Sequence, residues 1–206
     1  MFDPLDHHSP VVDFGAHLFP EDWTPRSGPL GDIIGPVLTD PERIRERYTE
    51  AGIDQVVLSR PPTMGAADAE AVATSNDELL GVVEEYSDFY GLASVPTAAG
   101  GEAAAAELER SLENGFHGGA VETMSDGIEL VDPEVEPIFE VADEYGAPLL
   151  VHPKIHNSLH EAVDVLSDEH KLNSIFGRET ALGGSISKLI HEGTFEKYPD
   201  LNLVFH

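Results

Sequence analysis

Cysteine is absent from this chain of 206 residues, which excludes disulfide scaffolds and thiolate metal sites. Basic residues are scarce: 11 lysines and arginines stand against 39 acidic residues, and the net charge is −28. Such a charge repels nucleic-acid phosphates and anionic lipid surfaces, so we expect no nucleic acid and no membrane partner. A large acid excess combined with ordinary hydrophobic runs is typical of halophilic proteins, in which salt screens the repulsion.

Long apolar runs are missing as well, and those present are too short to span a bilayer. The opening residues, MFDPLDHHSP, lack the basic region and the apolar core of a signal peptide. We therefore expect a cytoplasmic protein. With 41% hydrophobic residues the chain can bury a core, and we expect residues 1–206 to form one domain.

Short apolar runs recur along the chain, with helix-like segments between them. The spacing of the middle runs is that of a strand, a crossover helix and the next strand, which predicts a βα repeat and an α/β fold. The runs are VVDFGAHLF (11–19), QVVLSRPP (55–62), FYGLASVP (89–96), HGGAVETM (117–124), PLLVHP (148–153) and LNLVFH (201–206).

Two of the intervening segments carry matching helix signals. Asp40 is a typical N-cap, Pro41 suits the first turn, and Gly52 suits the end of a helix. Residues 132–146 repeat this layout, with an aspartate and a proline at the start and a glycine at the end. The repetition strengthens the prediction that helices alternate with the strands.

Parallel strands joined by helices form either an open doubly wound sheet or a closed barrel. No glycine-rich phosphate fingerprint follows any predicted strand, which argues against a nucleotide-binding open sheet. Polar residues and histidines instead cluster at the C-terminal strand ends, where TIM-type barrels place their chemistry. We therefore predict a TIM-type (β/α)8 barrel. The strand-end residues are His17, Ser59, Arg60, Glu122, His152 and His206.

The strand count falls short of a complete barrel. A barrel of this type needs eight strands and about 250 residues, whereas the sequence contains six apolar runs. The last run ends at His206 with no helix after it. We therefore expect about six βα units in this chain and a barrel that is incomplete at its C-terminus.

His17 and His152 are the strongest candidates for chemistry, because each ends a predicted strand at the same barrel mouth. Neutral imidazole is a common ligand of divalent cations, and catalytic zinc sites usually use three protein ligands and a water molecule. The alternative is that each is a hydrogen-bonded structural histidine, but the shared mouth favours a metal site. Alternation on the first strand predicts Asp13, Gly15 and His17 on one face.

Two charged strand-end residues are secondary candidates. Arg60 could clamp a substrate carboxylate through paired hydrogen bonds, although a surface ion pair explains it equally well. Glu122 could be an extra metal ligand or a proton carrier, and a surface carboxylate is an equal alternative in so acidic a chain. The run HGGAVETM contains no lysine, which disfavours a carbamylated lysine that bridges two metals.

Four longer stretches follow one another along the chain: EAGIDQVVLSRPP, SNDELLGVVEEYSDFYGLASVP, DPEVEPIFEVADEYGAPLLVHP and GTFEKYPDLNLVFH. Together they resemble the amidohydrolase-related family, whose best-known type decarboxylates aminocarboxymuconate semialdehyde. The stretches keep the family's order, and the resemblance covers nearly the whole chain. It implies a metal-dependent (β/α)8 barrel of the hydrolase kind.

The resemblance also implies roles for several residues. The family's first strand supplies a His-x-His pair to the metal, and here Gly15 stands at its first position and His17 at its second. His152 corresponds to the metal ligand of the fifth strand. The sixth-strand histidine, which in the family activates the metal-bound water, falls at His206 or just beyond it. An aspartate ligand of the eighth strand lies outside this sequence.

We accordingly expect a metal-dependent enzyme of the amidohydrolase superfamily that decarboxylates or hydrolyses a small unsaturated or aromatic carboxylic acid through a metal-bound water. His206 is the expected catalytic residue, and Arg60 is the expected substrate-binding residue. The expected cofactor is one divalent metal ion, zinc or alternatively manganese, and the resemblance suggests a homodimer. The alternative, motivated by Gly15, is a metal-free homologue that binds a ligand or serves as an assembly subunit.

Overall fold

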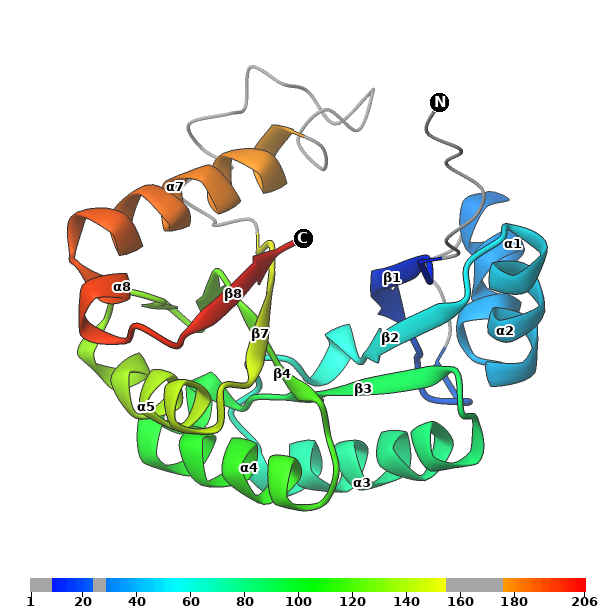
Figure 1. Ribbon diagram of the computed structural model, residues 1–206, viewed down its shortest axis with the longest axis horizontal. Helices are drawn as coiled ribbons and strands as arrows, with labels where there is room; N and C mark the ends of the chain where they lie inside the picture. Colours follow the sequence, from blue (N-terminus) through cyan, green and yellow to red (C-terminus); the bar gives the residue numbers. More distant parts are fainter. Residues whose placement is uncertain (1–8, 24–28, 155–175) are drawn as a thin grey trace.

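The computed structural model describes residues 9–23, 29–154 and 176–206. Its main sheet has six parallel strands in the order β1-β2-β3-β4-β7-β8, one in each predicted apolar run. The sheet curls into half of a barrel, with helices along its outer face and β1 and β8 at its edges (Figure 1). The predicted α/β fold is confirmed as a partial TIM-type barrel. The strands are β1 (Val12–His17), β2 (Gln55–Ser59), β3 (Phe89–Ser94), β4 (Gly118–Glu122), β7 (Pro148–His152) and β8 (Asn202–Phe205).

Helices follow the strands, as the βα repeat predicts. The α-helices of the described ranges are α1 (Pro29–Leu38), α2 (Pro41–Glu50), α3 (Ala69–Glu85), α4 (Gly101–Glu113), α5 (Glu136–Tyr145), α7 (Arg178–His191) and α8 (Thr194–Lys197). A short antiparallel ribbon, β5 (Met124–Ser125) and β6 (Ile128–Glu129), follows β4. None of these helices is both long and apolar enough to cross a membrane.

Helix α2 begins and ends where the sequence predicts. The Asp40 side chain accepts a hydrogen bond from the backbone N–H of Arg43, and Pro41 occupies the first turn. Gly52 follows the helix with a φ of 78°, a left-handed conformation that glycine adopts without steric cost. The predicted capping layout of this helix is confirmed.

Helix α5 departs from the predicted layout at its start. Residues Pro133–Val135 form a 3-10 turn, and the α-helix begins only at Glu136. Asp132 therefore does not cap it, and its carboxylate accepts a hydrogen bond from the backbone N–H of Glu129 instead. The predicted C-terminal end is correct, because Gly146 is the C-cap of the helix and has a left-handed backbone conformation.

The strands are apolar on both faces because both faces are packed. Two clusters fill the space between the sheet and the helices, with fully buried leucines such as Leu58 and Leu149. Burying one such side chain contributes about 1.5–3 kcal/mol. A third cluster lines the inner face of the curl and consists of Val57, Met64, Leu92, Ala120 and Leu150. This inner cluster forms a floor beneath the C-terminal strand ends.

A bulge in β1 decides which of its side chains face the inside of the curl. The pairing of β1 with β2 shifts between Asp13 and Ala16, so one extra residue is inserted there. Phe14 packs against the inner cluster, whereas Ala16 belongs to an outer cluster. The prediction that Asp13 shares the face of His17 is therefore wrong. Asp13 lies beside Tyr48 of α2, whose pKa rises to about 12 through burial and this carboxylate.

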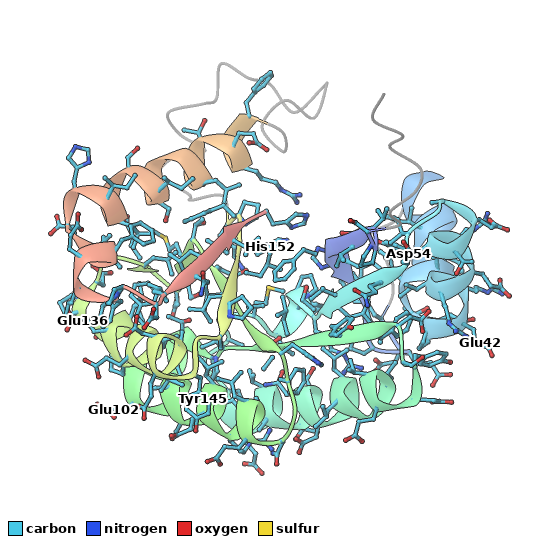
Figure 2. The ribbon with its side chains drawn as sticks, viewed as in Figure 1. Glu42, Asp54, Glu102, Glu136, Tyr145 and His152 are labelled. Atoms are coloured by element: carbon cyan, nitrogen blue, oxygen red, sulfur yellow. The ribbon has the colours of Figure 1, made fainter. Side chains whose placement is uncertain are left out.

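Much of the acid excess lies on the outside of the molecule. Glu42, Glu102 and Glu136 are exposed on α2, α4 and α5, and they point away from the sheet (Figure 2). His152 points the other way, into the hollow of the curl (Figure 2). The concave side therefore differs in chemistry from the acidic outer surface.

Candidate metal centre

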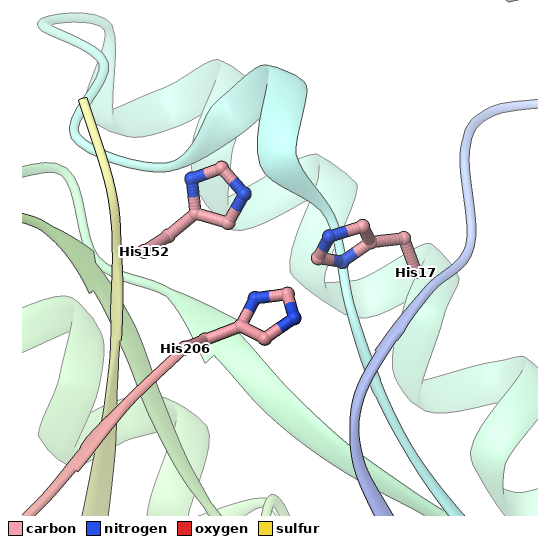
Figure 3. Close-up of side chains that lie close together, drawn as sticks. All are labelled: His17, His152 and His206. Carbon is pink, nitrogen blue, oxygen red and sulfur yellow. The ribbon is translucent and has the colours of Figure 1, made fainter. Parts of the chain in front are cut away.

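Three histidines meet at the C-terminal end of the sheet. His17 ends β1, His152 ends β7, and His206 follows β8 (Figure 3). Their ring centroids are 5.4 Å apart for His17 and His152, 5.6 Å for His17 and His206, and 5.8 Å for His152 and His206. One nitrogen of each ring lies within 4.8 Å of the other two. The rings thus form a nearly equilateral triangle of potential ligands.

His17 is oriented by its neighbour on β2. Its Nδ1 lies 3.0 Å from Oγ of Ser59, the residue directly across the strand pair. The Ser59 hydroxyl donates to the Ala16 carbonyl at 3.3 Å, so its oxygen is free to accept the Nδ1 proton. With Nδ1 bonded to Ser59, Nε2 is the ring nitrogen left for a second partner, and such outer contacts orient metal-binding histidines.

His152 and His206 sit side by side on neighbouring strands. The β7–β8 register pairs Val151 with Phe205, and the backbone N–H of His206 donates to the Val151 carbonyl at 3.2 Å. Nδ1 of His152 is buried and has no hydrogen-bond partner among the described residues. Buried polar nitrogens are rarely left unpaired, so this atom indicates a missing ligand or partner.

The electrostatics keep two of the three rings neutral. Burial and, second to it, the nearby His206 together lower the pKa of His17 to about 4. Burial likewise lowers the pKa of His152 to about 4, with His17 as the next cause. At neutral pH both imidazoles are therefore uncharged, which is the form that binds a metal.

Glu122 faces the same mouth and is directly paired with His152 in the β4–β7 register. Its side chain is 6% exposed, and its two carboxylate oxygens accept hydrogen bonds from Lys154 Nζ at 2.8 and 3.0 Å. Burial raises the pKa of the Glu122 carboxyl, and the ammonium group opposes that rise. The carboxylate is thus already paired with a cation, and its role as ligand or proton carrier stays a prediction.

Arg60 is not brought to the histidines. It follows Ser59, and consecutive strand residues point to opposite faces, so its side chain runs outward to α3. Its Nη1 donates to the Glu78 carboxylate at 2.7 Å and to the Ser75 carbonyl at 3.2 Å. Arg60 thus forms an ion pair with Glu78, as the alternative explanation supposes. The substrate-binding role of Arg60 stays a prediction.

The whole described sheet lies within one family match. A sequence profile described as amidohydrolase matches residues 12–206. This chain belongs to the amidohydrolase family. The match begins in β1 and runs through the strand ends that carry His17, His152 and His206.

One curated protein similar to this amidohydrolase is the 2-amino-3-carboxymuconate-6-semialdehyde decarboxylase of Dictyostelium discoideum, at 29% identity over 175 residues. The alignment covers 81% of this chain and 47% of that protein. The chain thus spans about half the length of this curated relative.

Solved structures of decarboxylases share the fold. A dihydroxybenzoic acid decarboxylase from Polaromonas sp. JS666, with bound manganese and the inhibitor 2-nitroresorcinol, has a TM-score of 0.83 at 21% identity, covering 95% of this chain and 64% of its own. A 5-carboxyvanillate decarboxylase from Novosphingobium aromaticivorans, complexed with manganese and 4-hydroxy-3-methoxy-5-nitrobenzoic acid, has a TM-score of 0.76 at 26% identity, covering 86% and 52%. Structural relatives of this chain thus include decarboxylases of aromatic acids that bind manganese.

The residues present fit a divalent cation. The ring triangle offers nitrogen donors at a spacing that one ion can bridge, and Nδ1 of His152 has no partner among the described residues. Ser59 was recognised in the sequence only as a strand-end residue, and its contact with His17 was missed. Knowledge of the β1–β2 register would have revealed it, because the two residues are direct partners.

Proposed function

We propose that this chain carries the metal centre of an enzyme that decarboxylates, or alternatively hydrolyses, a small aromatic or unsaturated carboxylic acid. The observation that carries the proposal is the meeting of His17, His152 and His206 at one mouth, with nitrogens within 4.8 Å of one another. Three imidazoles from strands far apart in the sequence are a common arrangement for catalytic zinc. The proposed cofactor is one divalent cation, zinc or alternatively manganese.

The reaction class is supported by the relatives. The three named relatives are decarboxylases of carboxylic acids, two of them with manganese and aromatic ligands. When bound, a divalent cation supplies Lewis acidity that polarises a substrate carboxylate or carbonyl. The substrate is thus proposed to be a small carboxylic acid that enters from the concave side of the sheet. The pairing of two chains into a homodimer stays a separate prediction.

The chain's own residues prepare the site for that role. Ser59 bonds Nδ1 of His17 and so restrains its ring, and burial keeps His17 and His152 uncharged. The inner apolar floor below them excludes water from one side of the mouth. The sequence assigned proton transfer to His206, which requires its imidazole to remain outside the ligand set.

The first test is the metal content of the untagged protein, measured by plasma mass spectrometry. We expect about one equivalent of a transition metal per chain, and its loss in the His17→Ala and His152→Ala variants. His191→Ala is the matched control, because His191 is exposed on α7 and, within the described part of the chain, bonds the Ser187 carbonyl alone. Turnover of dihydroxybenzoates would follow as carbon dioxide release, and unchanged turnover in His152→Ala would contradict the proposal.

A second candidate is favoured by Gly15, which stands where the family resemblance implies a metal ligand. In that case the chain is a metal-free homologue that binds a ligand or serves as an assembly subunit. A metal ratio near zero, persisting after zinc or manganese is added, would support this candidate. Stoichiometric metal lost in the histidine variants would exclude it.

A further inference from the structure

We infer that His206 is a third metal ligand of this site, admitted to it by the absence of a side chain at Gly15. The inference rests on the proposed function and assigns His206 differently from the sequence, which had it as a free proton-transfer residue. Two observations carry it: the space at Gly15 is filled by the His206 ring, and the three rings are evenly spaced around one point.

The contact with Gly15 is close. A Cβ built on Gly15 would lie 2.7 Å from Nε2, 2.8 Å from Cδ2 and 3.3 Å from Cε1 of His206. Contacts below 3.0 Å are essentially never seen for a real Cβ, so any side chain at this position would displace the ring. The strand ends of β1 and β8 thus touch across the mouth, although the two strands are not paired.

Backbone conformation does not explain the glycine. Gly15 is not among the glycines of positive φ, so an L-residue could adopt its backbone. Its N–H donates to the Asp13 carboxylate at 2.8 Å, a contact that any non-proline residue could make. The structural demand at position 15 is therefore the room for the His206 imidazole.

The three nitrogens suit one small cation. Zinc–nitrogen bonds of about 2.0–2.1 Å in a tetrahedron put ligand nitrogens about 3.3 Å apart. The nitrogens here lie within 4.8 Å of one another, and His206 is the exposed member of the set. Small movements of the three side chains, led by the exposed His206, would bring the nitrogens to that spacing.

The ligand set has a chemical consequence. Imidazole nitrogens favour zinc and similar cations, whereas manganese prefers carboxylate and water oxygens. Glu122, the carboxylate next to His152, already accepts hydrogen bonds from Lys154 with both oxygens, and the ligand set inferred here contains only nitrogen donors. We therefore expect this chain to bind zinc and cobalt much more tightly than manganese.

The test measures zinc affinity by competition with a chromophoric chelator, and ligation by the visible spectrum of the cobalt(II) protein. His206→Ala is expected to weaken zinc binding by more than about tenfold, as His17→Ala does, and to change the cobalt spectrum. Gly15→Ala is expected to weaken binding similarly by displacing the ring. Combining Gly15→Ala with His206→Ala should add little, because both changes remove the same ligand.

A ligand swap makes the test reciprocal. In the chain with Gly15→His and His206→Ala together, an imidazole returns from β1, and zinc affinity should recover relative to His206→Ala alone. His206→Asn is a second variant of the same position, and circular dichroism melting shows whether each variant folds. His191→Ala should leave affinity and spectrum unchanged.

The outcomes separate the two proposals. If the wild-type protein binds zinc and His206→Ala and His206→Asn bind it equally well with an unaltered cobalt spectrum, His206 is not a ligand. The proposed function would then stand with His206 outside the metal's ligand set. If the wild-type protein binds none of zinc, cobalt and manganese, both the ligand assignment and the proposed function fail.

Discussion

His17 Nδ1 and Ser59 Oγ lie 3.0 Å apart across the β1–β2 pair, and this contact restrains the orientation of the imidazole at the barrel mouth. Outer contacts of this kind set both the tautomer and the direction of a metal-binding histidine, and their loss typically costs about 10–100-fold in metal affinity. The metal affinity of the barrel mouth should therefore depend on Ser59, a residue that need not contact the cation.

Ser59→Ala is expected to lower zinc affinity by about 10–100-fold while leaving the fold intact. The buried Ser111 hydroxyl, which donates to Glu107 at 3.1 Å, offers a matched control. Ser111→Ala should cost a similar free energy of unfolding, about 1 kcal/mol, without changing zinc affinity. Equal zinc affinities for the wild-type protein and Ser59→Ala would show that the hydrogen bond does not matter for binding.

The metal-free protein should lose stability as the pH falls from about 6.5 to 4. The pKa values of His17 and His152 lie near 4 in the folded chain, against 6.5 for an unperturbed histidine. Between these values the unfolded chain binds more protons, so the free energy of unfolding rises with pH. Urea unfolding at several pH values, compared with a variant carrying His17→Asn and His152→Asn, isolates this contribution. An equally steep pH dependence in both proteins would refute it.

Lys154→Met is expected to destabilise the protein more than Glu122→Gln does. Removal of the ammonium leaves the carboxylate of Glu122 buried without a partner, which costs about 1–3 kcal/mol, whereas the glutamine leaves only the half-exposed Lys154 unpaired. The double variant should recover part of the loss. Thermal unfolding at pH 7 measures the three values, and a larger loss for Glu122→Gln would contradict the expectation.

Gly118→Ala and Gly81→Ala should change stability in opposite directions. A Cβ at Gly118 would lie 2.3 Å from the Pro148 carbonyl oxygen on β7, so overpacking should cost about 1–3 kcal/mol. Gly81 is exposed within α3, and a Cβ there meets nothing within 4 Å. Alanine at that position should add about 0.5–1 kcal/mol through helix propensity. Denaturant midpoints compare them, and a neutral Gly118→Ala would mean that β4 and β7 can separate.

The main sheet and the three histidines of the centre were predictable from the sequence because apolar runs and strand ends are local signals. The strands of the described sheet lie in the predicted runs, and His17 and His152 are at the predicted mouth. Asp13 was misplaced because the bulge in β1 breaks the alternation of faces, and no local residue pattern indicated it.

The remaining misses depend on contacts between distant residues. The bond between His17 and Ser59 depends on strand register, and the contact of Gly15 with His206 depends on the curvature of the whole sheet. Arg60 is a different case, because alternation after Ser59 already indicated the outward direction that the structure gives it. The position of Arg60 was thus within reach of the sequence, whereas its partner Glu78 was not.

The two edges of the sheet carry ligands of the same centre, since His17 ends β1 and His206 follows β8. A cation bound by both histidines would link the first and last strands of the curled sheet and would close a loop that contains nearly all of the described chain. Closing so long a loop removes conformational entropy from partly opened states. The ion would then stabilise the fold as well as take part in the chemistry. Its removal should let β1 and β8 separate at the mouth before the apolar clusters between the sheet and the helices unfold.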